Sequence, residues 1–139
     1  MKRLLPISLT LLILSSAPAY AEWVEVAKGG NATSYMDPDT IRSKGTMVKM
    51  WGLDDQKSTQ TSDREGKSYL SLKLQMEFDC AEEQLRTLAE HGYSGKMGTG
   101  EIVFSHTKPS NWAPPIPASV GQANWKFACK KLVTNGPIF

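Results

Sequence analysis

The sequence has few of the residues on which catalytic and metal sites depend. Its 139 residues include only two histidines and two cysteines. His91 and His106 do not follow the spacing of a metal-binding pair such as H-x-x-x-H, and neither a G-x-S-x-G nucleophile turn nor a phosphate-binding loop occurs. We therefore expect no catalytic residues, no metal site and no cofactor, and each histidine to be solvated or hydrogen-bonded. An enzyme would instead place a histidine beside a serine or carboxylate inside a cleft.

Long apolar runs are also scarce, and the one that exists lies at the start of the chain. Residues 4–16 are mostly apolar and follow two basic side chains, but they are too short to span a bilayer comfortably. Ala19 and Ala21 then form the A-x-A pattern that signal peptidase requires. We predict a cleavable signal peptide over residues 1–21 and a periplasmic or secreted mature domain over residues 22–139, with no stable membrane anchor after cleavage. Retention as a membrane anchor is the alternative.

The predicted mature domain has no excess of either charge. Lys2 and Arg3 account for two of the 16 basic side chains in the whole chain, so the remainder equals the 14 acidic ones in number. Proteins that bind nucleic acid depend on clustered lysine and arginine contacts with phosphates. We therefore expect no nucleic-acid partner.

The two cysteines, Cys80 and Cys129, both lie in the predicted mature domain. An exported chain meets an oxidising compartment, so the simplest expectation is one disulfide between them. Their spacing offers no C-x-x-C pair of the kind used in thiol redox chemistry. The bond would close a loop of about 50 residues and constrain the unfolded state by roughly 4 kcal/mol at most.

Alternation of apolar and polar residues predicts strands along much of the domain. The clearest case is Ser68–Asp79, where five apolar side chains occupy every second position: Leu70, Leu72, Leu74, Met76 and Phe78. Shorter strands are predicted at residues 23–28, 33–36, 46–53 and 101–107. Residues 37–41 are expected to form one helical turn with Asp37 as its N-cap. Residues 54–67 are polar and are expected to form a mobile loop between two long strands.

The second half of the domain contains one ambiguous segment and one predicted helix. Residues 80–94 place apolar side chains at helical spacing, so local propensity favours a helix there. Residues 109–117 contain three prolines in W-A-P-P-I-P and are expected to be extended, because proline cannot donate a backbone hydrogen bond. Residues 120–131 are predicted to form a closing helix, with Ser119 as N-cap and Cys129 on its buried face.

Four tryptophans are many for a domain of this size. We expect Trp51 and Trp125 to pack in the core. Trp112 stands beside three prolines, where full burial is hard to arrange. A rigid proline-rich segment can present an aromatic side chain to a partner at little entropic cost, so Trp112 and Tyr93 are candidate partner-binding residues.

A series of short motifs runs through the predicted mature domain in a definite order. The motifs are W-V-E-V, Y-M-D-P-D-T-I, M-W, a long alternating strand ending F-D-C, then Y-S-G, W-A-P-P-I-P-A-S and F-A-C. In this order, with both cysteines among the landmarks, they resemble the bacterial surface-adhesin protein E family over nearly all of residues 22–139.

The resemblance implies an α+β fold with a single antiparallel sheet of about six strands. A C-terminal helix would pack on one face of the sheet, tied there by the Cys80–Cys129 disulfide. The resemblance also implies that Gln84–Tyr93 is a strand, and we adopt the strand over the helix that local propensity favours.

The family's namesake activity is attachment to host extracellular-matrix and plasma proteins, which implies a protein partner. Pairing of exposed sheet edges would also allow a homodimer. We therefore expect an exported, non-enzymatic cell-envelope protein that acts as a protein-binding or adhesin-like module. The alternative is a periplasmic small-ligand-binding or inhibitor protein in which sheet and helix enclose an apolar cleft.

Overall fold

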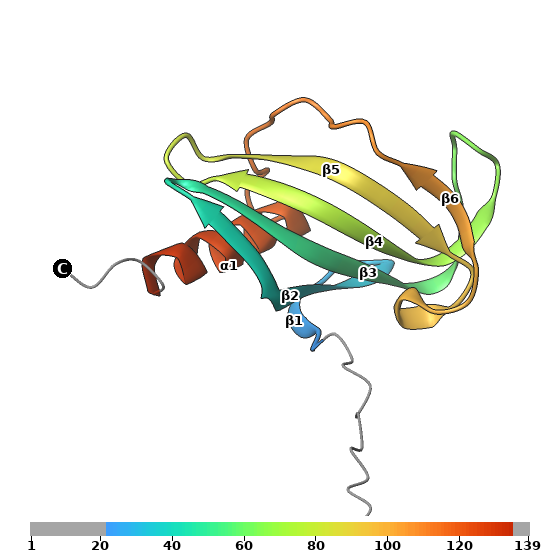
Figure 1. The fold of residues 1–139 in the computed structure, drawn as a ribbon. Coiled ribbons are helices and arrows are strands. Elements are labelled where there is room, and N and C mark those ends of the chain that lie inside the picture. The colour runs from blue at the N-terminus through green and yellow to red at the C-terminus, as the bar shows by residue number, and fades with distance from the viewer. Residues whose placement is uncertain (1–21, 135–139) are drawn as a thin grey trace, which may run out of the picture.

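The computed structural model describes residues 22–134 and consists of one antiparallel sheet with a helix against it (Figure 1). The six strands are β1 (Val24–Lys28), β2 (Ala32–Lys44), β3 (Met47–Thr61), β4 (Ser68–Asp79), β5 (Gln84–Tyr93) and β6 (Ile102–His106). A short 3-10 helix, η1 (Lys96–Gly98), precedes β6, and the α-helix α1 (Val120–Thr134) ends the described chain. The predicted signal peptide, residues 1–21, lies outside the described residues.

The strands follow one another across the sheet in chain order, and every neighbouring pair is antiparallel. This arrangement, with one C-terminal helix and one disulfide, confirms the fold class expected from the resemblance. Within residues 22–134 no helix is both long enough and apolar enough to cross a membrane.

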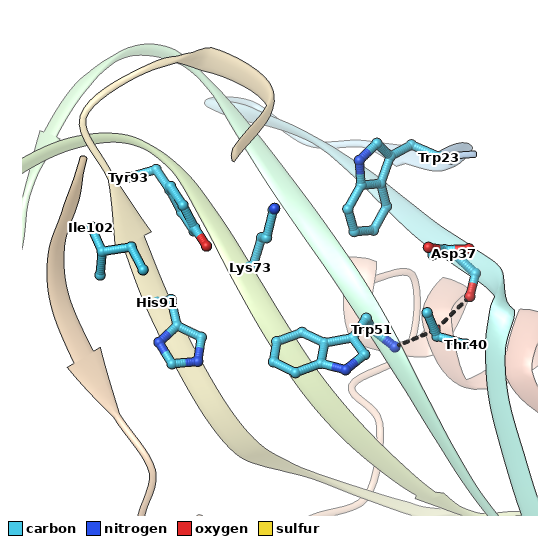
Figure 2. A pocket seen from close by; sticks show the side chains of 8 residues that line it. All are labelled: Trp23, Asp37, Thr40, Trp51, Lys73, His91, Tyr93 and Ile102. Carbon is cyan, nitrogen blue, oxygen red and sulfur yellow. Dashed lines mark hydrogen bonds between the residues drawn. The ribbon is translucent and has the colours of Figure 1, made fainter. Parts of the chain in front are cut away.

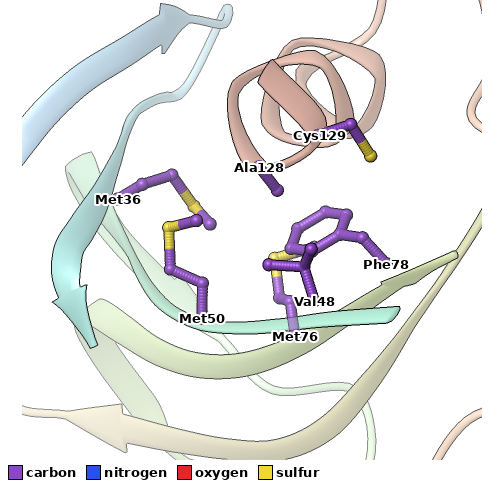
Figure 3. Close-up of a cluster of buried hydrophobic side chains, with 7 residues drawn as sticks. All are labelled: Met36, Val48, Met50, Met76, Phe78, Ala128 and Cys129. Carbon is purple, nitrogen blue, oxygen red and sulfur yellow. The ribbon is translucent and has the colours of Figure 1, made fainter. Parts of the chain in front are cut away.

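The hydrophobic core lies between α1 and one face of the sheet. Alternate side chains of β2, β3 and β4 point toward the helix (Figure 3), and the buried cluster consists of Met36, Val48, Met50, Met76, Phe78, Ala128 and Cys129. Cys80 follows β4 directly and forms the predicted disulfide with Cys129, with a Cα–Cα distance of 5.6 Å. Trp125 packs against the same cluster and donates its indole N–H to the Asp79 carbonyl at 3.1 Å, so its predicted core role is confirmed.

The helix begins where its capping signal predicted. The Gln122 backbone N–H donates to Ser119 Oγ at 3.1 Å, which satisfies one of the free N–H groups in the first turn.

Two predictions for the β2–β3 region are wrong. Residues 37–41 form no helical turn; they lie inside β2, at an irregularity where its pairing with β3 shifts between Asp37 and Arg42. Asp37 Oδ1 accepts the Asp39 N–H at 3.1 Å, so the side chain that suggested a helix cap stabilises a bulge instead. Residues 54–67 are not one loop, because β3 continues to Thr61 and only residues 62–67 connect it to β4.

The ambiguous segment after Cys80 is a strand, as the resemblance implied and against its local propensity. Asp79 Oδ1 accepts the backbone N–H groups of Ala81 and Glu82, at 3.1 and 3.0 Å, and these bonds turn the chain back on itself. β5 then pairs with β4 along its whole length. Local propensity favours a helix here by only about a few tenths of a kcal/mol per residue, and the ladder of backbone hydrogen bonds with β4 outweighs that preference.

The proline-rich segment is extended, as predicted, and covers part of the outer edge of β5. Ala113 and Leu85 exchange two backbone hydrogen bonds of 3.1 and 2.9 Å, and the Ser110 N–H donates to the Thr87 carbonyl at 2.9 Å. β6 pairs only with the last residues of β5, so this segment protects the strand edge that β6 leaves open.

Candidate functional site

The two faces of the sheet have different surroundings. One face packs against α1; we call the opposite one the open face, because α1 does not cover it, and η1 lies over part of it. Met97 and Gly98 of η1 donate their backbone N–H groups to Asp55 Oδ1 and Ser71 Oγ, at 2.7 and 2.8 Å. η1 thereby covers Leu53, which is fully buried.

The open face holds a cavity of about 370 Å³ beside η1 (Figure 2). We call it the aromatic pocket, and its lining residues are Trp23, Asp37, Thr40, Trp51, Lys73, His91, Tyr93 and Ile102. Five strands and the residue before β1 contribute to it, so the pocket exists only once the sheet has assembled.

Trp51 occupies the middle of the pocket. Its ring stacks on the His91 ring with centroids 6.0 Å apart and an angle of 21° between the planes. Its backbone N–H donates to Thr40 Oγ1 at 3.0 Å, and that hydroxyl donates to the Asp37 carbonyl at 2.7 Å. The bulge in β2 thus fixes the strand position that carries Trp51.

The expected core position of Trp51 is wrong. Its neighbour Met50 points toward α1 and is 1% exposed, and successive side chains of a strand point to opposite faces. Trp51 is therefore directed to the open face, where it is half-buried. The alternation of Val48, Lys49, Met50 and Trp51 is the sequence signal for this orientation, and it outweighs the general tendency of tryptophan to lie in the core.

One cation and one carboxylate stand among the aromatic walls of the pocket. Lys73 Nζ lies 4.9 Å from the centroid of the Tyr93 ring. Asp37 lies on the other side of Trp51 (Figure 2) and is only 5% exposed. The pocket can therefore hold an apolar or aromatic group while placing a positive charge next to it.

The structure separates the two predicted partner-binding residues. Tyr93 lies in the aromatic pocket at the end of β5. Trp112 lies near the start of β5, where the guanidinium carbon of Arg86 is 4.5 Å from its ring centroid. Arg86 also donates from Nε to Glu77 Oε2 at 2.7 Å. Trp112 is therefore half-buried against an ion pair and lies apart from the pocket.

Both histidines are hydrogen-bonded, as expected. His91 Nδ1 lies 2.8 Å from Ser105 Oγ, and His106 Nε2 lies 2.6 Å from Glu65 Oε1. His91 lines the aromatic pocket, so one pairing has the histidine–serine distance that an enzyme would need. The His91 ring also stacks on the Trp51 ring, which cannot orient the imidazole as a carboxylate does. Among the described residues, no three His, Cys, Asp or Glu side chains are placed to hold a metal ion.

Comparisons with known proteins agree with the fold. The model of the surface-adhesin protein E family matches residues 23–130. A crystal structure of protein E from non-typeable Haemophilus influenzae superposes with a TM-score of 0.61 and 14% identity, covering 86% of this chain and 83% of that one. Crystal form II of Haemophilus influenzae protein E gives a TM-score of 0.61 and 15% identity, covering 80% and 89%.

At these identities the solved structures establish the fold alone, and no curated protein matches the chain. The family match extends across nearly all of the described residues and confirms the resemblance seen in the motifs. The chain therefore belongs to the surface-adhesin protein E family, a membership that implies an exported, adhesin-like protein.

Proposed function

We propose that this chain is a non-enzymatic module of the cell envelope that binds a protein partner through its open face. The aromatic pocket would hold an anchor side chain of that partner. The observation that supports this most directly is the presence of Trp23, Trp51 and Tyr93 around a cavity on the face that α1 leaves free. Tryptophan and tyrosine in a concave surface are the residues most enriched among binding hot spots.

The position of the pocket favours a protein partner over the small-ligand alternative. That alternative places an apolar cleft between sheet and helix, but there the space around Phe78 is filled by the buried core cluster (Figure 3). A cavity of about 490 Å³ does lie between β1 and the start of α1, but polar side chains such as Lys28 and Gln122 line part of it, so it is not the expected apolar cleft. The aromatic pocket lies on the other face and opens outward (Figure 2). A partner with its own surface would cover such a site and exclude water from around the anchor.

The proposed absence of catalysis is tested at the one histidine–serine pair in the pocket region. Ser105 lies exposed on β6, and in that pair its hydroxyl would be the nucleophile with His91 as the base. A fluorophosphonate probe labels activated serines, and we expect it to leave this protein unmodified. Labelling of Ser105 that disappears in His91→Ala would contradict the proposal.

Binding is tested with purified residues 22–139 immobilised on a surface. Host matrix and plasma proteins, and an extract of the bacterial envelope, are passed over wild type, Trp51→Ala and Lys126→Ala. We expect saturable binding of a protein that weakens about tenfold or more in Trp51→Ala, the effect of removing a hot-spot side chain. Lys126 is exposed on α1, away from the open face, and its variant should bind like wild type.

Two results would contradict the proposed binding mode. One is the absence of any saturable protein partner, and the other is equal binding by wild type and a folded Trp51→Ala. Melting temperatures establish that each variant is folded. A small molecule that stays bound to the wild-type protein in native mass spectrometry, and that is absent from Trp51→Ala, would support the small-ligand alternative instead.

Export by a cleavable signal is also part of the proposal. Cleavage after Ala21 predicts that the protein recovered from its own cells begins at Glu22. Intact-mass measurement of the periplasmic and secreted fractions checks this, and a protein that retains residues 1–21 would show that the segment stays as an anchor.

A further inference from the structure

A second cavity, of about 280 Å³, lies on the open face beside the turn between β2 and β3. We call it the basic groove, and it is lined by Arg42, Ser43, Lys44, Met47, Lys49 and Glu77. Its single carboxylate is already neutralised, because Arg86 Nη2 lies 2.7 Å from Glu77 Oε2. The groove is therefore a concentration of positive charge on a domain whose basic and acidic side chains balance.

The three cations of the groove have no acidic partner within residues 22–134. Arg42 Nη1 donates to the backbone carbonyls of Ile41 and Asp39, at 2.7 and 3.3 Å, while Lys44 and Lys49 are exposed. Asp79, which pairs across from Met47, uses Oδ1 to accept two backbone N–H groups. The charges of the groove are thus available to an anionic ligand.

The basic groove and the aromatic pocket are in register along β3. Lys49, Trp51 and Leu53 occupy successive positions on the open face, and Lys73 of β4 pairs directly across from Leu53. Two residues of a strand span about 7 Å. A cation therefore lies about 7 Å along the strand on each side of Trp51.

An extended peptide repeats its own side chains at the same interval, since residues i−2, i and i+2 share one side about 7 Å apart. Resting on the proposed function, we infer that the partner offers an acidic extended segment to the open face. An aromatic or apolar residue at i enters the aromatic pocket, and Asp or Glu at i−2 and i+2 pairs with the basic groove and with Lys73. Charge-assisted hydrogen bonds at both ends would fix the register of the segment.

The apolar position between two cations favours a peptide over other polyanions. A sulfated polysaccharide or a phosphate-rich surface supplies the negative charges but carries no side chain to fill a cavity lined by Trp23, Trp51 and Tyr93. A peptide supplies both, at the interval set by the β3 register.

The inference is tested by fluorescence polarisation with a labelled peptide, Gly-Glu-Ser-Phe-Ser-Glu-Gly. Three matched peptides replace both glutamates by lysine, replace phenylalanine by alanine, or move the glutamates next to phenylalanine. We expect the first peptide to bind about fivefold or more tightly than each of the others. Its binding should weaken between 50 and 500 mM salt, roughly the range in which exposed charges become screened.

Charge reversals locate the binding site on the protein. Lys49→Glu and Lys73→Glu should each weaken peptide binding about fivefold or more, whereas Lys126→Glu on α1 makes the same charge change and should have no effect. If Lys73→Glu does not fold, Lys73→Gln removes the charge at that end, and Arg42→Glu, at an exposed side chain, provides a second position in the basic groove.

Three results would overturn the inference of an acidic segment. The lysine peptide could bind as tightly as the glutamate peptide, or Lys126→Glu could weaken binding as much as Lys49→Glu does. Heparin could also bind more tightly than the peptide and still bind to Trp51→Ala. Capture of a protein partner that requires Trp51 but is unaffected by Lys49→Glu and Lys73→Glu overturns this inference and leaves the proposed function standing. The absence of any protein partner would contradict both this inference and the proposed function.

Discussion

Asp54 is a carboxyl group held mostly away from water on the face of the sheet that α1 covers. Burial raises its pKa above the ordinary 3.8; a hydrogen bond with Ser34 lowers it and the charge of Glu90 raises it further. The unfolded chain therefore releases this proton at a lower pH than the folded protein does. At neutral pH, folding buries the charged carboxylate, which lowers the stability of the folded protein. This destabilisation is absent below pH 3.8, where the group is protonated in both states.

Asp54→Asn removes that charge and keeps a similar shape. We expect the variant to be more stable at pH 7 by on the order of 1 kcal/mol, the scale on which a poorly compensated buried polar group destabilises a protein. The gain should shrink as pH falls through the raised pKa toward about 3. Urea unfolding of both proteins across this pH range provides the measurement, and equal stability at neutral pH would show that Asp54 is adequately compensated.

The Phe104 ring lies so close to Gly92 of β5 that no side chain fits at this position. A Cβ atom there would lie far inside van der Waals contact with the Phe104 ring, which is 9% exposed and packs edge-on against Tyr69. Gly92→Ala should destabilise the domain by about 1 to 3 kcal/mol, as overpacking does. Gly30 has no atom within 4 Å of the equivalent position, so Gly30→Ala is the matched control.

Thermal and urea unfolding distinguish the two glycine variants. Adding Phe104→Leu to Gly92→Ala should recover part of the loss, because the clash is with the ring. If Gly92→Ala and Gly30→Ala unfold alike, the ring can move aside without cost.

Individual strands and the helix depend unequally on local sequence. Ser68–Asp79 is predicted in full, because Leu70 to Phe78 alternate without interruption and one face is buried. The polar end of β3 is missed, since Asp54 and Asp55 have no apolar alternation and are held by pairing with β2 and β4. β5 has helical spacing locally, and only its long-range pairing makes it a strand.

The disulfide is the covalent link between β4 and α1. It joins residues 49 apart in sequence, and Cys129 belongs to the buried core cluster. Reduction, or the double variant Cys80→Ala with Cys129→Ala, should therefore lower the free energy of unfolding by up to about 4 kcal/mol. Melting temperatures in the presence and absence of reductant test this, with mass spectrometry to verify that the thiols are free. An unchanged melting temperature in fully reduced protein would remove the structural role of the bond.

At the scale of the whole molecule, the sheet separates the core packed against α1 from the proposed binding surface. α1 and the core occupy one side, while the aromatic pocket and the basic groove lie on the other. Of the pocket, sequence reasoning identified only Tyr93. Trp23, Trp51 and Ile102 come from distant parts of the chain and meet because the strands pair in order, which no local pattern encodes.

This separation predicts a one-sided footprint when a partner binds. Hydroxyl-radical labelling should decrease at Trp23, Trp51 and Tyr93 and stay constant at Trp125, which packs between α1 and the sheet. Peptide mass spectrometry of free and bound protein measures the change. Protection confined to Trp112 would move the binding site to the proline-rich segment.

The link between Cys80 and Cys129 also determines which parts of the molecule carry load when its ends are pulled. Tension passes directly between the two sulfur atoms, so the 49 residues of separation cannot lengthen, although extended they would reach about 170 Å. β5 and β6 lie in the segment closed by the disulfide and carry no tension, whereas β1 to β4 lie on the load path. The boundary between loaded and unloaded strands passes through the aromatic pocket. His91 and Tyr93 belong to the unloaded β5, whereas Trp23 and Trp51 lie on the load path. A force applied to the two ends would therefore load the wall formed by Trp23 and Trp51 and leave the wall formed by His91 and Tyr93 outside the load path.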